Sequence, residues 1–369
     1  MSCVVCRILR VCCVCVSLVE MQDFVLSKNI LNRQVCEVAS LMFHPDEQIL
    51  ISGDMNGNID YLLYDENATC SHGNDGKSFN PHKGASVRCM DYIPNVNGVV
   101  SSDADGRIVL SSFDPKIVSS WKFKDGMNTV RVLNENILVG GDDEGKIRGI
   151  DIREKKSIFS ISKDGQTDFI SSLTMGCTAS PLKTLVSTSG DCTLAVYDLR
   201  STTKSIVAIS DEQEDEINCS LLMNNEQHVL TGNANGVVGI WKQGYWGDLK
   251  DRLPLYNKGV GVDGSRSIDY MKKIDETHFL TVTTDGVIRL VNLFPNVVEK
   301  IIGVAQDSAT VSAMDCDIES NLIAICNGGD EKGTIKFFNI ANIETNDPVQ
   351  FTKSDNPEKA NRQSFFGDI

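Results

Sequence analysis

Basic residues are scarce in this sequence relative to acidic ones. The 369 residues include 35 lysines and arginines against 50 aspartates and glutamates, which gives a formal net charge of −15. Because affinity for nucleic acids rests mainly on clustered lysine and arginine, this balance disfavours a broad phosphate-binding surface. It leaves room for a local basic patch only, and direct nucleic-acid binding is not the function that we expect.

Long apolar runs are lacking as well. The opening segment is apolar, but Arg7 and Arg10 interrupt it, and the clean run over residues 11–19 is too short to span a bilayer. A weak signal peptide is one reading; no small-residue cleavage pattern follows it, and Met21 offers an alternative start. We predict that residues 1–21 form a cysteine-rich N-terminal extension that is disordered or mis-assigned, and we expect no direct membrane contact.

The sequence shows no pattern of catalytic or metal-ligating residues. Its histidines are dispersed, without metal-ligand spacing or a local Ser, Cys or carboxylate partner: His44, His72, His82, His228 and His278. We interpret them as turn and surface residues. The glycines at 259, 261 and 264 match a dinucleotide-binding pattern, but they lead into a predicted strand at 267–271 instead of a helix. We therefore predict a chain without catalytic residues, cofactor or metal.

The cysteines do not form a disulfide framework. There are thirteen, an odd number, and five of them fall in the first fifteen residues. The Cys3-x-x-Cys6 pair has no second pair at zinc-finger spacing. We expect single cysteines in apolar strands, such as Cys89 and Cys326, to be small buried hydrophobic residues of a reducing compartment.

What the sequence does contain is an internal repeat. The unit is an apolar pair, a small residue, a turn ending in Asx-Gly, and an apolar residue two places later; the first copy is Leu50, Ile51, Ser52, Asn56, Gly57 and Ile59. The turn positions are 57, 106, 145, 192, 236, 286 and 333. Cys192 replaces the glycine in the fourth copy, and an insertion displaces the strand of the seventh.

The repeat predicts an all-β fold. The spacings between the turns run from 39 to 50 residues, close to the length of a four-stranded propeller blade. Asx-Gly pairs supply the positive φ angles of tight hairpins, and the apolar pairs before them are typical of buried strands. Most copies end in an apolar residue followed by Asp or Asn, as in Tyr64-Asp65 and Tyr197-Asp198.

These features over residues 36–340 resemble the WD repeat, which implies a seven-bladed β-propeller. The Gly-His dipeptide typical of that repeat is largely missing, and only His82 stands where its histidine falls. We place the propeller at residues 22–341 and a tail at 342–369. Since a ring closes by borrowing a strand from the far end of the chain, residues 22–26 or residues 348–352 would supply that strand.

Two groups of residues are candidates for protein binding. One is the acidic cluster at 210–216, a solvated loop or a site for a basic segment, with Asp211, Glu212, Glu214, Asp215 and Glu216. The other is a pair of Asp-x-Arg motifs, Asp151 with Arg153 and Asp198 with Arg200. This pair resembles the motifs of WD-repeat substrate receptors of cullin-4 ubiquitin ligases, in which the arginines contact the adaptor subunit.

Longer strings point to one family. The segments SDEQEDEI (210–217), GDLKDRLP (247–254), SIDYM (267–271), DGVIRLVNLFPN (285–296) and NRQSFFGDI (361–369) resemble the WD repeat-containing protein 55 family. The resemblance implies a non-enzymatic scaffold that binds pre-ribosomal proteins in ribosome biogenesis and ribosomal-RNA processing, in the nucleus and nucleolus. The tail carries few basic residues, so this localisation would depend on partners, and a cytoplasmic pool is compatible with it. The ubiquitin-ligase receptor is the alternative function.

Overall fold

The computed structural model describes residues 24–26, 36–64, 77–154, 156–161, 165–175, 184–199, 205–255, 267–304, 311–317, 319, 321–328 and 335–340. Several predictions of the sequence analysis fall outside these residues: the extension at 1–21, the tail, the glycines at 259–264, His72, Arg200 and the seventh turn at 333.

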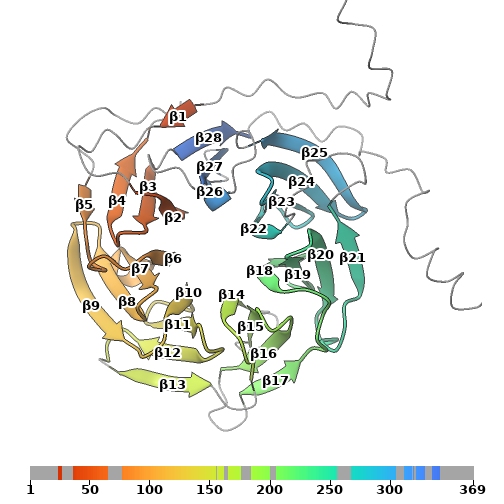
Figure 1. The fold of residues 1–369 in the computed structure, drawn as a ribbon, viewed down its shortest axis with the longest axis horizontal. Coiled ribbons are helices and arrows are strands. Elements are labelled where there is room, and N and C mark those ends of the chain that lie inside the picture. The colour runs from red at the N-terminus through yellow and green to blue at the C-terminus, as the bar shows by residue number, and fades with distance from the viewer. Residues whose placement is uncertain are drawn as a thin grey trace, which may run out of the picture.

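The described strands form seven four-stranded antiparallel sheets arranged as a ring (Figure 1). The innermost strands are β2 (Val38–Phe43), β6 (Val87–Ile93), β10 (Met127–Val132), β14 (Ile170–Met175), β18 (Ile217–Met223), β22 (Ile268–Lys273) and β26 (Val311–Asp317). The second strands are β3 (Ile49–Asp54), β7 (Gly98–Asp103), β11 (Ile137–Asp142), β15 (Thr184–Ser189), β19 (His228–Asn233), β23 (His278–Thr283) and β27 (Leu322–Asn327). The predicted seven-bladed propeller is confirmed.

The outer half of each blade completes the ring. The third strands are β4 (Ile59–Leu63), β8 (Arg107–Ser112), β12 (Ile147–Asp151), β16 (Leu194–Asp198), β20 (Val237–Lys242), β24 (Val287–Leu293) and β28 (Ile335–Asn339). The outermost strands are β5 (Lys77–Phe79), β9 (Lys116–Lys122), β13 (Ser157–Ile161), β17 (Ile206–Ile209), β21 (Asp251–Pro254), β25 (Asn296–Val304) and β1 (Phe24–Leu26). The described residues include one helical segment, the 3-10 turn η3 (Pro94–Val96), and no helix long and apolar enough to cross a membrane.

The ring is closed by the N-terminal strand. β1 pairs antiparallel with β28, with Phe24 opposite Phe337 and Leu26 opposite Ile335, so the seventh blade takes its outermost strand from the other end of the chain. Of the two candidates for this strand, residues 22–26 contain the one that pairs. Residues 348–352 lie outside the described residues.

The predicted turns have the expected backbone conformation. Five of the six described turn positions are glycines with φ between 75° and 83°, at 57, 106, 145, 236 and 286. Cys192 adopts φ 65° at the equivalent point of blade 4, although it carries a Cβ. The hairpin geometry therefore holds even where the sequence does not supply its usual residue.

The apolar pair of each repeat explains how the blades stack. Neighbouring residues of a strand point to opposite faces of the sheet, and every blade lies between two others. Leu50 packs in the hydrophobic cluster between blades 7 and 1, whereas Ile51 packs between blades 1 and 2. In blade 5, Val229 likewise faces blade 4 and Leu230 faces blade 6. The core is thus seven clusters, one between each pair of successive blades.

The strand cysteines take part in these clusters. Cys326 is 1% exposed in the cluster between blades 7 and 1, as predicted. Cys89 is only half-buried, because it lies on an innermost strand and its thiol points across to the Val130 carbonyl oxygen, 3.6 Å away in blade 3. Cys89 forms no disulfide with a described residue.

Candidate protein-interaction surfaces

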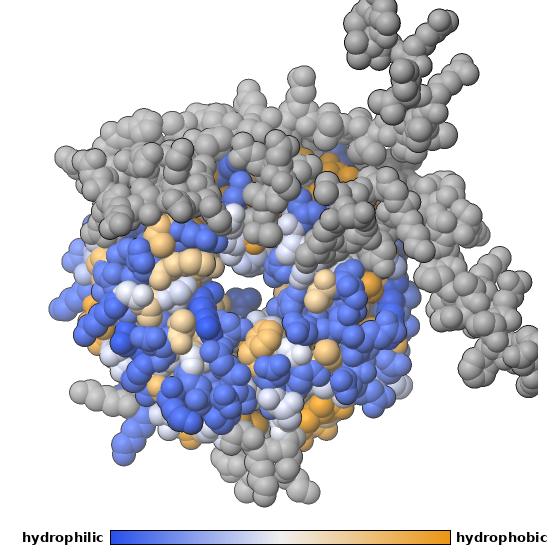
Figure 2. Space-filling view, viewed as in Figure 1, coloured by the Kyte–Doolittle hydropathy of each residue, from blue (hydrophilic) through white to orange (hydrophobic). Residues whose placement is uncertain are grey.

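The loops of the propeller lie on two faces of the ring. One carries the Asx-Gly turns together with the loops that join one blade to the next; we call it the turn face. Hydrogen bonds tie these loops together, as from the Phe123 N–H to the Gly106 carbonyl (2.7 Å) and from the Leu255 N–H to the Gly236 carbonyl (3.0 Å). The remaining loops form the opposite face. Figure 2 shows the opening at the centre of the ring, with polar residues over much of the described surface around it.

The acidic cluster forms a well-anchored loop on the turn face. Residues 210–216, the acidic loop, connect β17 of blade 4 to β18 of blade 5. The Gln213 N–H donates to the Cys192 carbonyl (2.9 Å), and the Ala234 N–H donates to the Glu216 carbonyl (3.0 Å). Because both neighbouring turns hold its backbone, the loop presents its side chains from a fixed position between two blades.

Part of the charge of the acidic loop is neutralised within the chain. Glu214 forms an ion pair with Arg252 (3.1 Å), and Asp215 accepts a hydrogen bond from the Asn235 side chain (2.6 Å). Asp211, Glu212 and Glu216 are exposed and form no ion pair with any described residue. These three carboxylates therefore carry negative charge that is open to a partner.

The turn at Cys192 lies close enough to the carboxylates of this loop for their charges to act on it. The pKa of the Cys192 thiol is raised, first by burial and then by the negative charges of Glu212, Glu216, Asp191 and Asp215. Carboxylates from a turn of blade 4 and from the inter-blade loop thus converge on one point of the turn face.

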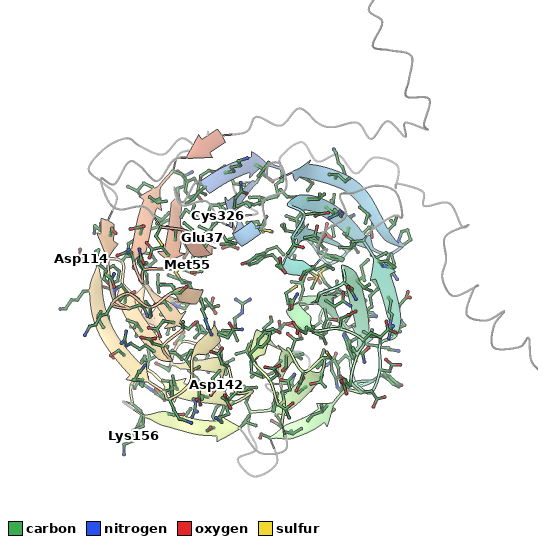
Figure 3. All side chains as sticks on the ribbon, in the orientation of Figure 1. Glu37, Met55, Asp114, Asp142, Lys156 and Cys326 are labelled. Carbon is green, nitrogen blue, oxygen red and sulfur yellow. The ribbon has the colours of Figure 1, made fainter. Side chains whose placement is uncertain are left out.

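The first Asp-x-Arg motif lies on the opposite face, where β12 ends. The Asp151 carboxylate accepts a hydrogen bond from the Arg153 backbone N–H (2.9 Å) and another from its Nε (2.9 Å). The hydrogen bond from the Arg153 side chain is the main cause that lowers the pKa of Asp151 to about 2. The Arg153 side chain is nevertheless 66% exposed. Figure 3 shows Lys156, which follows in the same loop, at the outer edge of the ring.

The second motif begins at the equivalent place in the next blade. Asp198 ends β16 and is half-buried, and its backbone N–H donates to the Ser205 carbonyl (2.6 Å). Arg200 lies outside the described residues. The structure therefore puts Asp151 and Asp198 on adjacent blades, and it places both on the other side of the ring from the acidic loop.

A buried polar network, which was not predicted from the sequence, lies beneath the turn face. His82 Nδ1 lies 2.8 Å from the Asp103 carboxylate, and His82 Nε2 lies 2.7 Å from Ser101 Oγ. All three residues are fully buried. Burial acts to raise the pKa of Asp103, but hydrogen bonds from His82 and from the Arg107 backbone N–H outweigh it and lower that pKa. The three residue types are those of a hydrolytic triad, yet no substrate can reach them, so they hold the loop onto its turn.

The prediction that the histidines are surface residues is wrong for three of the four described histidines, the first of which is the buried His82. His44 and His228 are also buried, at 3% and 6% exposure, because their rings fill space at strand ends. The sequence does carry a signal for His82, because this residue stands where the histidine of the Gly-His dipeptide falls in a WD repeat. In blade 4 the same role falls to Gln166, whose side chain bonds Ser187 Oγ and the Thr193 carbonyl (2.8 Å). No sequence signal marks a glutamine for that role.

The described residues include no group of three or more His, Cys, Asp or Glu side chains placed to hold a metal ion.

Comparison with known proteins agrees with this architecture. The family described as WD domain, G-beta repeat matches residues 73–110, the copy that contains His82 and Asp103. WD repeat-containing protein 55 of Arabidopsis thaliana is 28% identical over 265 residues, which cover 71% of this chain and 70% of the plant protein. WD repeat-containing protein JIP5 of Cryptococcus neoformans is 27% identical over 71% of this chain and 68% of its own length.

A more distant relative covers more of the chain. The WD repeat-containing protein 55 homolog of Drosophila melanogaster is 24% identical over 89% of this chain and 61% of its own length. The resemblance predicted from the sequence strings is thereby confirmed. The chain is a WD-repeat β-propeller, and it is a relative of the WD repeat-containing protein 55 family.

Proposed function

We propose that this chain is a non-enzymatic scaffold of ribosome biogenesis, which supports ribosomal-RNA production and processing by binding pre-ribosomal proteins in the nucleus and nucleolus. The observation that carries the proposal is the acidic loop: three exposed carboxylates that form no ion pair with a described residue, on a backbone fixed between two blades. Proteins that assemble on RNA carry basic segments for the phosphates, and such a segment is complementary in charge to this loop. The cellular process is part of the proposal, and it is the one that the resemblance of the sequence strings to the WD repeat-containing protein 55 family led us to expect.

Depletion followed by rescue tests the proposal. Cells depleted of the protein should accumulate unprocessed ribosomal-RNA intermediates on gels, and the wild-type chain should restore processing. A chain with Asp211→Asn, Glu212→Gln and Glu216→Gln should restore it poorly and should co-purify fewer pre-ribosomal proteins.

The matched control changes the same charge elsewhere. Asp46, Glu47 and Glu154 are exposed carboxylates in loops of the opposite face. Their conversion to Asn, Gln and Gln alters the net charge equally and should leave rescue intact. Normal ribosomal-RNA intermediates in depleted cells would contradict the proposal.

A second candidate function rests on a different observation. Arg153 is exposed while Asp151 holds its guanidinium in place, which suits a preorganised contact with another protein. We propose as the alternative that the chain is a substrate receptor of a cullin-4 RING ubiquitin ligase, which docks to the adaptor through Asp151, Arg153, Asp198 and Arg200.

Arginine replacement tests this alternative. The double variant Arg153→Ala, Arg200→Ala should lose co-purification of the ligase adaptor. The control is Arg252→Ala, because Arg252 is a 45% exposed arginine that pairs with Glu214 on the turn face. An unchanged pull-down with the double variant removes the receptor function and leaves the scaffold untouched, since the two use different faces.

A further inference from the structure

A pocket of about 460 Å³ opens on the turn face at the mouth of the central channel; we call it the mouth pocket. It is lined by Ala39, Arg88, Asn128, Asp143, Asp168 and Phe169. The first three are the second residues of the innermost strands β2, β6 and β10, and the last three belong to turn-face loops of blades 3 and 4. The pocket is therefore built by four consecutive blades.

The charges of the lining leave one carboxylate uncompensated. Arg88 Nη1 lies 2.5 Å from Asp143 Oδ1, so these two charges largely cancel. Gly126 packs against the pair: a Cβ there would lie 2.3 Å from Asp143 Oδ2. Asp168 is exposed, and its side chain forms no ion pair with a described residue. Asp168 Oδ1 accepts a hydrogen bond from the Phe169 N–H (2.7 Å). The pocket is thus net negative.

The lining also offers acceptors and an aromatic ring. Asn128 Nδ2 donates to the Ile170 carbonyl (2.9 Å), which leaves its Oδ1 as an acceptor. The Phe169 ring packs on Gly190, where an added Cβ would lie 2.3 Å from Cε1, and the Phe169 carbonyl accepts from the Gly190 N–H (3.0 Å). Both the ring and the Asp168 carboxylate are therefore held in place before any ligand arrives.

Hydrogen bonds connect the mouth pocket to the acidic loop. The Thr167 N–H donates to the carboxylate of Asp191 (2.7 Å), which lies in the turn that also contains Cys192. The Cys192 carbonyl in turn accepts the Gln213 N–H of the acidic loop (2.9 Å). The pocket and the three open carboxylates of that loop therefore belong to one continuous, rigid part of the turn face.

We propose that the mouth pocket binds the side chain of an arginine in the basic segment that the acidic loop recruits; this inference rests on the proposed function and names the group that its partner inserts. A guanidinium is planar, stacks on an aromatic ring, and carries five N–H donors for carboxylate and amide oxygens. An ammonium carries three donors around a compact charge and gains less from the Phe169 ring. The chemistry of the pocket thus selects arginine over lysine.

Fluorine NMR on the purified full chain tests the assignment. The protein is labelled with 4-fluorophenylalanine, and Phe169→Leu identifies the Phe169 signal. Capped arginine amide should shift this signal saturably, whereas capped citrulline, its neutral isostere, should not. Capped lysine amide should bind about tenfold more weakly, which corresponds to about 1.4 kcal/mol.

Two variants test the assignment of the pocket further. Asp168→Asn should weaken the arginine response about tenfold, and Glu154→Gln, on the opposite face, should leave it unchanged. An equal response to citrulline, a stronger one to lysine, or no saturable shift with arginine overturns the inference. The titration needs no ribosomal readout. If arginine amide causes no shift but the acidic-loop variant still loses its partners, only the inference about the pocket is refuted. If arginine amide binds but depleted cells process ribosomal RNA normally, only the proposed function is refuted.

Discussion

At the scale of single residues, burial decides what each polar group does. His82, Asp103 and Ser101 contain the atoms of a catalytic triad, but complete burial turns them into a structural link between an inter-blade loop and a turn. Arg153, in contrast, is exposed: Asp151 holds its guanidinium, and two thirds of its side chain is in contact with water. The first group stabilises the ring, and the second is available to a partner.

Replacement of the buried histidine should be costly. His82→Ala leaves the Asp103 carboxylate buried without its nearest side-chain partner, and loss of one member of such a pair should lower the free energy of unfolding by about 3 kcal/mol. Urea unfolding followed by tryptophan fluorescence measures it. Lys124→Ala, at a side chain that is 91% exposed, should change stability by less than about 0.5 kcal/mol. Equal stabilities of His82→Ala and the wild-type chain would contradict a structural role for the buried network.

The Asp151–Arg153 pair makes a prediction about pH. The pKa of Asp151 is lowered to about 2, mainly by the Arg153 side chain, against about 3.9 in an unfolded chain. A carboxyl group whose pKa is lower in the folded chain stabilises the fold at pH values above its pKa in the unfolded chain. This contribution is lost as the pH falls toward 2. In Arg153→Ala, carbon NMR of the carboxyl should show the pKa rising, though only partly, because the backbone N–H still donates. An unchanged pKa would contradict the hydrogen bond.

At the scale of elements, the hairpin turn and the apolar pair carry the fold, and both are local in sequence. An Asx-Gly turn fixes its own φ angle, and an apolar pair faces two neighbours wherever a strand lies between two sheets. For this reason the blades and most turns could be predicted from the sequence. The substitution of Gln166 for a histidine could not, because only contacts with residues far along the chain, such as Ser187, define that role. The acidic loop could be located, but which of its carboxylates are paired depends on Arg252 and Asn235.

The turn glycines allow a test that separates conformation from crowding. Gly106 and Gly244 have φ of 83° and 81°, but a Cβ on Gly106 would lie 2.2 Å from the Asp125 carbonyl oxygen, whereas one on Gly244 would meet nothing within 4 Å. Gly244→Ala should cost about 1 kcal/mol for the left-handed conformation. Gly106→Ala adds the clash and should cost about 3 kcal/mol. Thermal unfolding of the two variants compares them, and equal losses would refute the close approach.

At the scale of the whole molecule, closure of the ring joins residues that are more than 300 positions apart, from Phe24 to Phe337. The choice between the two closing strands was open from the sequence, because both ends of the chain offer short apolar segments and no local pattern ranks them. Because closure makes the ring one frame, the two proposed partners would bind separate faces of the same frame. The acidic loop and the Asp-x-Arg motifs are held by the same blades but lie on opposite sides of the ring.

Removal of the closing strand should therefore affect the entire ring. A chain without residues 1–35 leaves the edge of β28 unpaired, and exposed edges favour pairing with other molecules. We expect a lower melting temperature and concentration-dependent oligomers by light scattering. A chain without residues 1–21 keeps β1 and should behave as the full chain does. Identical behaviour of both truncations would contradict closure by β1.

In the proposed function, the turn face receives a basic segment of a pre-ribosomal protein. Zero-length carboxyl-to-amine cross-linking of the protein purified with its partners, followed by mass spectrometry, tests it most directly. We expect cross-links from Asp211, Glu212 or Glu216 to lysines of pre-ribosomal proteins. Cross-links confined to Asp46, Glu47 and Glu154 of the opposite face, or to proteins without a role in ribosome assembly, would contradict it.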